Sequence, residues 1–505
     1  MNSTSTQSYS ALCRLIKPAI KCYNVYVKKI IISKLFLYRY RFVIGYIILG
    51  LSFLGLLFLL PLYAQSGLSQ AEIDSATNSY YLSIDAPLNG DLVDLPYRLL
   101  QKLSIVIFGL TTYSIKLPSI MIGLLLGFLL ILLLNRWFKS NVSLLASCLM
   151  VLSTPFLFLA GSGTPLIMIV FWPTLLLWLG SKIQGEKRPK PMYSLLFAIA
   201  LLLAIFTPYM LYFAVFCVFF VFLQPHLRFI VKSLPKLPLT IVGLIIMAGV
   251  TALMMNIVNH PDTIIKLLFA DGFRLSDFLH NLLSGLAPMF LWNGSLENIF
   301  LAPLISLPTF ALALIGLFST TKGFFASRNS IASLLIVFTI IITGFNPSAV
   351  VFFILPFSIL IAHGLKYLLE KWYGLFPENP YARIAALLPL SILFAAILIP
   401  NLLQYVYGYR YNPSVANEFS YDLNAIRKNL NDETLLVENN FDFYRILERS
   451  TGIMVINELN ENQIVAKLAI LHHSFDSEEY TLTSIITSPM RENSDIIYLY
   501  TGKGE

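Results

Sequence analysis

The chain has 505 residues, 57% of them apolar and only 12% charged, with a formal net charge of +8 and a mean hydropathy of +0.74. Because an ordinary soluble domain carries about 25% charged residues, this composition excludes a soluble cytosolic enzyme, a nucleic-acid-binding protein and a disordered scaffold. The class that remains is a polytopic α-helical membrane protein.

The chain opens with a basic arm, residues 1–41, that contains eight of the 35 lysines and arginines. The first apolar stretch starts only after residue 41 and is too long for a cleavable signal peptide. We therefore expect the arm to remain on the chain at the cytoplasmic face, where it fixes the topology or contacts anionic lipid headgroups.

Eleven apolar stretches follow, and a helix needs roughly 20 such residues to cross a bilayer. The region 193–223 is too long for one crossing, and we divide it at Thr207-Pro208 because proline disfavours helix at the residue before it. The predicted membrane helices are residues 42–62, 115–134, 142–159, 165–181, 193–206, 208–223, 238–257, 300–319, 330–345, 347–363 and 384–403. Together they form a predicted transmembrane domain, residues 42–403.

The distribution of lysine and arginine predicts the orientation. With the N-terminus inside, 22 of the 35 basic residues fall in inner segments and five in outer loops, while eight lie in the C-terminal tail. This is the positive-inside pattern. Eleven crossings then place the C-terminal segment outside, and we expect a bacterial plasma-membrane protein.

The tail, residues 410–505, has a different composition and contains 15 of the 27 acidic residues. Short apolar runs at 434–437, 453–456 and 496–499 have the length and composition of strands. Residues 421–430 and 461–471 are predicted helices. About 95 residues suffice for a small extracytoplasmic α/β domain.

Two long outer loops, residues 63–114 and 258–299, hold nearly all the polar side chains of the membrane domain. In the first loop Asp94, Arg98 and Lys102 recur at helical spacing opposite a row of leucines, which predicts an amphipathic helix along the membrane surface. The second loop has a similar segment that begins at Arg274 and contains Asp277.

Several motifs in this region resemble those of the GT-C membrane glycosyltransferases, especially the protein O-mannosyltransferase and aminoarabinose-transferase branch. The corresponding segments are AEIDSATNSYY from Ala71, DLPYRLLQKLSIVIFG from Asp94, TTYSIKLPSIMIGLLLG from Thr111, and Leu152–Phe156 followed by Ala160-Gly161. The resemblance covers about residues 40–225. Two features differ: Ala71-Glu72 stands in place of an adjacent Asp-Glu pair, and Asp94-Leu95-Pro96 in place of a His-Pro-Pro run.

The resemblance implies that a sugar moves from a polyprenyl-phosphate donor to a lipid, glycan or protein acceptor at the outer face. A carboxylate, Asp74 or Glu72, would act as general base. The predicted substrate-binding residues are Asp94, Arg98, Lys102, Lys266 and Arg274, because the leaving phosphate needs cationic donors. No cofactor is required by the sequence, and no spacing identifies a metal ligand, although a divalent cation would suit the chemistry.

Three alternatives stay open. A lipid-linked glycan ligase or polymerase would also use large outer loops, and a flippase would place ionisable groups within the membrane. A non-catalytic GT-C protein would serve in binding or assembly. An active transferase should turn Asp74 or Glu72 toward a lipid-accessible cavity, whereas a buried, salt-bridged acid there would favour the non-catalytic alternative.

Overall fold

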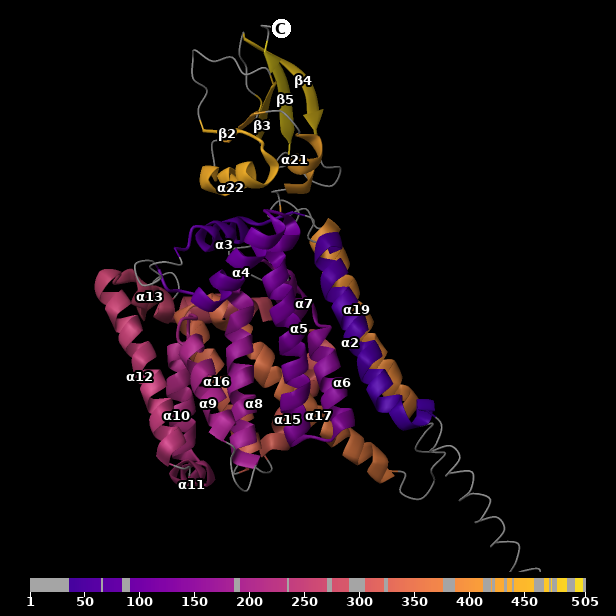
Figure 1. Cartoon of the computed structure of the whole chain (residues 1–505). Helices are drawn as coiled ribbons and strands as arrows, with labels where there is room; N and C mark the ends of the chain where they lie inside the picture. The colour runs from indigo at the N-terminus through magenta and orange to yellow at the C-terminus, as the bar shows by residue number, and fades with distance from the viewer. Residues whose placement is uncertain are drawn as a thin grey trace, which may run out of the picture. The chain divides into compact units, whose positions relative to one another are not determined.

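A computed structural model describes most of the chain (Figure 1). The described residues are 36–64, 67–83, 91–185, 191–233, 236–269, 275–289, 305–321, 326–375, 387–411, 419, 423–430, 434–437, 440–457, 467–471, 474, 479–487 and 496–502. The chain divides into two compact units, Met1–Leu56 and Leu57–Glu505. The described part of the first unit belongs to α2 (Phe36–Ala64), an apolar helix.

Six helical segments in the described residues are long and apolar enough to cross a membrane. They are α5 (Thr112–Trp137), η2 with α8 (Pro165–Ile167 and Met168–Gly185), α12 (Lys236–Asn259), α16 (Ser327–Phe345), η5 with α17 (Pro347–Phe353 and Ile354–Leu375) and α19 (Leu387–Tyr411). Their apolar sequences and lengths make this a multi-pass membrane protein.

Two bent pairs add to these spans: α6 with α7 (Ser140–Val151 and Thr154–Gly161, 65°) and α10 with α11 (Met210–Leu223 and Pro225–Ser233, 100°). Shorter apolar helices are Gly50–Leu60 within α2, α9 (Pro191–Ala204) and α15 (Leu307–Thr321). Each of the eleven predicted stretches overlaps one of these segments. The expected break at Thr207-Pro208 is also present, since α9 ends at Ala204 and α10 begins at Met210.

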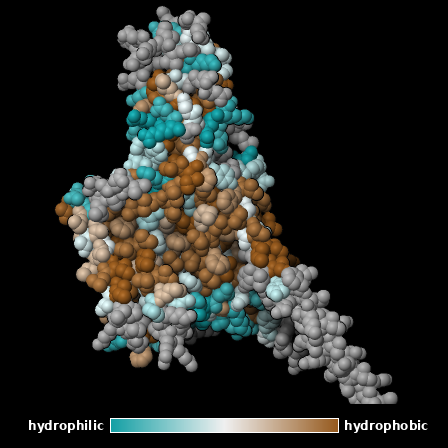
Figure 2. Space-filling view, viewed as in Figure 1, coloured by the Kyte–Doolittle hydropathy of each residue, from teal (hydrophilic) through white to brown (hydrophobic). Residues whose placement is uncertain are grey.

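Two glycines let α15 and α17 approach each other closely. A Cβ atom on Gly316 would lie 2.0 Å from the carbonyl oxygen of Leu360, and one on Gly364 would lie 2.2 Å from that of Leu312. Small residues at such crossings are typical of helix packing in lipid, where close backbone contact replaces the hydrophobic effect. Figure 2 shows apolar side chains over the middle of the membrane helices and hydrophilic ones toward their ends.

The two long loops that the sequence predicts to lie outside the membrane form short helices. They are α3 (Gln70–Tyr80), α4 (Leu95–Phe108), α13 (Asp262–Phe269), η3 (Leu275–Asp277), α14 (Phe278–Leu286) and η4 (Ala287–Met289). The predicted amphipathic helix is thus present as α4. Its apolar side chains Leu103 and Val106 are exposed, whereas Gln101 on the polar side is fully buried. Helix α4 therefore turns its polar face into the protein.

The C-terminal segment contains the expected sheet, with strand order β2-β1-β3-β5-β4. The strands are β1 (Thr434–Leu436), β2 (Val455–Ile456), β3 (Lys467–Leu471), β4 (Tyr480–Ile486) and β5 (Ile497–Gly502), and the helices are α21 (Leu423–Asn429) and α22 (Phe441–Thr451). Strand β1 pairs in parallel with β2 and β3, whereas β5 pairs antiparallel with β3 and β4. The domain boundary at 410 stays a prediction.

One predicted element of this segment is wrong. Residues 467–471, assigned to a helix that starts at 461, form strand β3, and residues 461–466 lie outside the described part. Strand β3 is central in the sheet, and Leu468–Leu471 are all buried. A strand covered on both faces has a continuous apolar run without alternation, and periodicity alone cannot separate it from a buried helix. Strand β4 and helix α22 were not predicted.

Candidate functional site

Helix α3 begins with a capping box built from Ser69 and Glu72. The Ser69 hydroxyl accepts a hydrogen bond from the backbone N–H of Glu72 at 3.4 Å, and the Glu72 carboxylate accepts one from the backbone N–H of Ser69 at 2.9 Å. This reciprocal arrangement satisfies two N–H groups that a helix start leaves without partners. One oxygen of Glu72 is therefore used to start α3.

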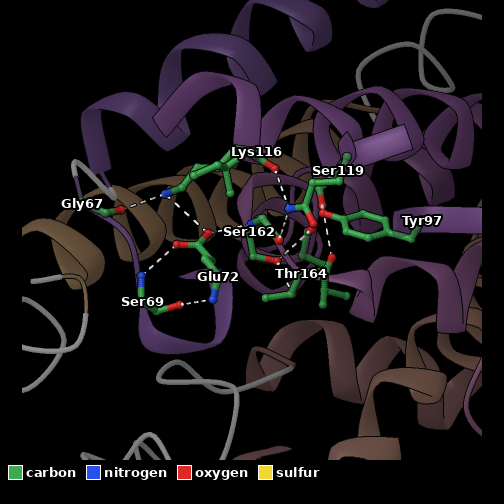
Figure 3. A network of polar contacts seen from close by, with 12 residues as sticks. Gly67, Ser69, Glu72, Tyr97, Lys116, Ser119, Ser162 and Thr164 are labelled. Atoms are coloured by element: carbon green, nitrogen blue, oxygen red, sulfur yellow. Dashed lines mark hydrogen bonds and ion pairs between the residues drawn. The ribbon is translucent and has the colours of Figure 1, made fainter. Parts of the chain in front are cut away.

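The second oxygen of Glu72 is also occupied (Figure 3). It accepts a hydrogen bond of 2.6 Å from the backbone N–H of Gly163 and lies 3.7 Å from the Lys116 ammonium. The two charged side chains are 0% and 1% exposed. Lys116 also donates to the carbonyl of Gly67 at 3.1 Å. Glu72 thus forms the centre of a buried network that joins α3, α5 and the turn after α7.

Gln101 of α4 extends this network. Its side-chain oxygen accepts hydrogen bonds from the hydroxyls of Ser75 and Ser79, and its amide nitrogen donates to the carbonyls of Ile115 and Gly163. All four hydrogen bonds are 2.7–3.2 Å long. Because a buried amide without partners is costly, these contacts explain why the polar side of α4 faces inward.

A second part of the network lies around Tyr97. Its phenol oxygen is 2.8 Å from the Ser119 hydroxyl, which donates to the carbonyl of Thr164 at 3.2 Å. Burial raises the pKa of Tyr97, so the phenol stays protonated. Lys116 and Ser119, both in the motif that starts at Thr111, therefore hold α3 and α4 to α5 and to the turn before η2 (Figure 3).

Asp74 is in a different environment from Glu72. It is exposed on α3, and its carboxylate accepts a hydrogen bond of 2.9 Å from the side-chain amide of Gln70. Residues two apart on a helix point in different directions. Of the two predicted bases, Asp74 is the one that water or a substrate can reach.

A cluster at Asp91 joins the two outer loops. Lys266 of α13 donates to the Asp91 carboxylate at 2.9 Å, and a guanidinium nitrogen of Arg98 lies 3.8 Å from the same oxygen. Arg98 also donates to the carbonyl of Asp91 at 3.0 Å. Burial alone would raise the pKa of Asp91. The hydrogen bonds that Asp91 accepts from Lys266 and Val93, together with the charge of Arg98, outweigh burial, so the pKa of Asp91 lies below its usual value.

Asp94 lies one turn before Arg98 and is 8% exposed. It occupies the N-cap position of α4 with a φ of 57°, but its side chain makes no capping hydrogen bond. Its Oδ1 atom is buried without a hydrogen-bond partner among the described residues. Burial raises the pKa of Asp94 to about 7, against the opposing charge of Arg98, and non-glycine residues in this backbone region are strained.

The structure thus brings Asp94, Arg98 and Lys266 into one region. Lys102 lies apart from that cluster and donates to the carbonyl of Leu82, and Arg274 is outside the described residues. Asp91, Gln101 and Lys116 were not predicted as site residues. Lys116 lies in the motif that starts at Thr111, and that motif is the feature of the sequence that could have identified it as a site residue. Within the described ranges, no group of three or more His, Cys, Asp or Glu side chains could hold a metal ion.

Comparison with known proteins supports the predicted class. A model of the dolichyl-phosphate-mannose-protein mannosyltransferase family matches residues 96–252, about a third of the chain. No curated protein matches in sequence. The crystal structure of ArnT from Cupriavidus metallidurans, bound to undecaprenyl phosphate, is 12% identical with a TM-score of 0.52, covering 91% of this chain and 98% of ArnT.

The chain has the GT-C fold. A second GT-C structure, the apo oligosaccharyltransferase of Archaeoglobus fulgidus, is 13% identical with a TM-score of 0.50, and the alignment covers 80% of this chain and 64% of that one. The family match includes α4 from Pro96 onward, Lys116 and Gly163, but it starts after Glu72 and Asp74. Together the family match and the fold support a glycosyltransferase that uses a lipid-linked donor.

Proposed function

We propose that this GT-C protein transfers a sugar from a polyprenyl-phosphate donor to a hydroxyl or amine of a lipid, glycan or protein at the extracytoplasmic face. The observation that carries the proposal is the junction at Asp91, where Arg98 of the first outer loop meets Lys266 of the second. The fold shared with ArnT supports it.

The donor phosphate would bind at this junction. The side chains of Arg98 and Lys266 are 16% and 50% exposed, and Asp91 holds them together. A phosphate entering here would replace Asp91 as the acceptor of their hydrogen bonds, and such charge-assisted bonds are strong. Asp94 would contribute in its protonated form, since a neutral carboxyl can donate a hydrogen bond to a phosphate oxygen.

Asp74 is the general base in this proposal. Its exposed carboxylate can approach an acceptor and remove its proton. Both oxygens of Glu72 are used by Ser69 and Gly163, which supports an anchoring role for Glu72. A carboxylate near the anomeric carbon also stabilises the oxocarbenium-like transition state.

The test uses the purified full chain in lipid vesicles, with a panel of radiolabelled polyprenyl-phosphate sugars and a membrane extract as the acceptor source. We expect Asp74→Asn to lower kcat by roughly 100-fold or more, as loss of a general base does. Arg98→Gln and Lys266→Gln should lower kcat/KM by about tenfold each. Lys366→Gln, a surface change on α17, is the matched control. Full turnover by Asp74→Asn would contradict the assignment of the base.

The proposed topology places the N-terminus in the cytoplasm and the first outer loop on the far side of a bacterial plasma membrane. In a variant whose four cysteines are replaced by serine, Asp74→Cys should react with a membrane-impermeant maleimide on intact cells. Reaction only after permeabilisation would put α3 on the cytoplasmic side and contradict the proposal.

The burial of Glu72 and its ion pair with Lys116 favour a second candidate, a non-catalytic GT-C protein that binds a lipid-linked sugar. That candidate predicts donor binding to the vesicle-embedded chain, weakened by Lys266→Gln, with no transfer to any acceptor. Formation of a labelled product that depends on Asp74 would exclude it. Polymer formation or donor movement without bond formation would instead identify a polymerase or a flippase.

A further inference from the structure

A cavity of about 300 Å³ lies at the end of the helix bundle away from α3 and α4. Helix α5 starts beside α4 at Thr112 and ends at Trp137, which lines this cavity. Gln184 at the end of α8 and Pro191 at the start of α9 also line it. Its volume is at the lower end of the range for small-molecule sites, about 300–1,000 Å³.

The cavity wall consists almost entirely of hydrocarbon. Leu176, Phe197, Phe216 and Phe220 contribute from α8, α9 and α10, and Leu227 and Val231 contribute from α11. Water in such a cavity would find few hydrogen-bond partners, so its binding is not favourable. An aliphatic chain in the cavity lowers the free energy because it removes apolar surface from contact with water or lipid headgroups.

Arg328 is the one charged side chain among the twenty described residues that line the cavity. Its Nη1 donates to the carbonyl of Trp137 at 2.7 Å and its Nε donates to the side-chain oxygen of Asn329 at 3.4 Å. The guanidinium carbon lies 5.4 Å from the ring centre of Phe138. The ion pairs of the described residues do not include Arg328. Glu370, whose charge acts on Arg328, is paired with Lys366. The guanidinium therefore retains donors for an anionic group.

The rim of the cavity carries further positive charge. Arg136 donates to the carbonyl of Ser181, which lines the cavity. Helix α11 bends 100° away from α10 and has exposed Arg228 and Lys232 beside an exposed Phe229. A short helix with basic and apolar faces is typical of the membrane surface and attracts anionic lipids.

We propose that this cavity binds one acyl chain of an anionic phospholipid, whose phosphate is held by Arg328. The apolar wall matches the chain, and the lone guanidinium at the chain's end matches the phosphate, for which arginine is well suited. The site is separate from the Asp91 junction, so it does not depend on the proposed sugar transfer.

A variant that fills the cavity tests the chain site. A Cβ atom on Gly180, which lines the cavity, has no neighbour within 4 Å, so Gly180→Phe should place its ring in the cavity. Gly243 on α12 is equally open and does not line the cavity, which makes Gly243→Phe the matched control. Native mass spectrometry of each detergent-purified full chain counts the phosphatidylglycerol molecules retained. We expect Gly180→Phe to retain about tenfold less than the natural chain or Gly243→Phe.

Arg328→Gln tests the phosphate contact. Arg445→Gln is its control, because Arg445 is exposed on α22 and does not line the cavity. Phosphatidylglycerol should bind about tenfold more tightly than phosphatidylcholine of the same chain length, and Arg328→Gln should remove that preference while Arg445→Gln keeps it. Inorganic phosphate should not displace the lipid, because it lacks the chain.

Equal binding of phosphatidylcholine, displacement by inorganic phosphate, or unchanged lipid retention in Gly180→Phe would overturn the proposal. Tighter binding of undecaprenyl phosphate than of phosphatidylglycerol would also overturn it, because the occupant would then be a sugar carrier. If Gly180→Phe does not fold, the headgroup preference and its loss in Arg328→Gln still decide the question.

Discussion

Glu72 and Lys116 form an ion pair with almost no exposure to water. Taking two charges out of water is costly, and their mutual attraction and hydrogen bonds must offset that cost. Here the carboxylate accepts from Ser69 and Gly163, and the ammonium donates to Gly67. Removing one partner leaves the other charge buried without compensation.

Glu72→Gln should therefore destabilise the protein by about 3–5 kcal/mol, the typical cost of breaking a buried pair. Thermal unfolding of the purified chain in one detergent measures the effect as a lower Tm. Asp74→Asn, two residues away on the exposed side of α3, should change stability by no more than about 0.5 kcal/mol. Equal Tm values for both variants would contradict the anchoring role of Glu72.

Asp94 predicts a pH-dependent stability. Its pKa is raised from 3.8 to about 7 by burial, so the folded state favours the protonated carboxyl. The contribution of this protonation to the stability of the fold is complete below pH 3.8 and is lost as the pH rises toward 7. The free energy of unfolding falls by at most about 4 kcal/mol over this range. Asp94→Asn should therefore have a higher Tm than the natural chain at pH 8, and the difference should shrink toward pH 5. A difference that does not vary with pH would contradict the raised pKa.

At the scale of elements, the turn between α7 and η2 packs closely against α5 at Gly163. A Cβ atom on Gly163 would lie 2.7 Å from Ile115 Cγ2 and 3.5 Å from Glu72 Cγ. The same glycine donates to Glu72 and accepts from Gln101. A larger residue must push this turn away from Ile115 of α5 and so disturb its hydrogen bonds with Glu72 of α3 and Gln101 of α4.

Gly163→Ala should lower stability by about 1–3 kcal/mol, as overpacking of a tight site does, and should reduce transfer activity because α3 and α4 shift. Gly243→Ala, in open space on α12, should leave Tm unchanged or raise it, since alanine favours helix. Tm and activity measured side by side check both variants, and an unperturbed Gly163→Ala would show that the turn has room to move.

At the scale of the whole molecule, the C-terminal domain shares a core with the outer helices. Leu68, Ile73 and Ile105 belong to the same buried cluster as Leu423 and Tyr444. Polar contacts accompany this cluster: Gln70 donates to Asn440, and Arg449 donates to the phenol of Tyr80. The domain therefore contributes to the environment of the proposed base as well as forming a sheet of its own.

Ending the chain after Tyr411 should expose this cluster. Each large apolar side chain left in water costs about 1.5–3 kcal/mol, so we expect a loss of several kcal/mol, a lower Tm and a tendency to aggregate. A chain that ends at Gly502 keeps every strand and is the control. Size-exclusion chromatography and thermal unfolding compare the two, and identical behaviour would mean that the cluster does not stabilise the outer helices.

Local composition determined much of this protein. All eleven predicted apolar stretches correspond to helical segments, because burial in lipid depends on the apolarity of each stretch itself. The amphipathic pattern around Leu99 and Leu103 predicted α4, and the short runs near 434 and 497 predicted β1 and β5. The family motifs also led to the correct fold class, since they lie in one continuous part of the chain.

Only the tertiary structure decided which polar groups meet. Glu72 binds Gly163 across 91 residues, and Asp91 binds Lys266 across 175, and no local pattern contains such pairings. The spacing of apolar and polar residues along an amphipathic helix does not tell which face packs against the protein. Gln101 lies on the inward face because its side-chain amide donates to the carbonyls of Ile115 and Gly163. For the same reason the sequence treated Glu72 and Asp74 as equivalent candidates, and burial separated them.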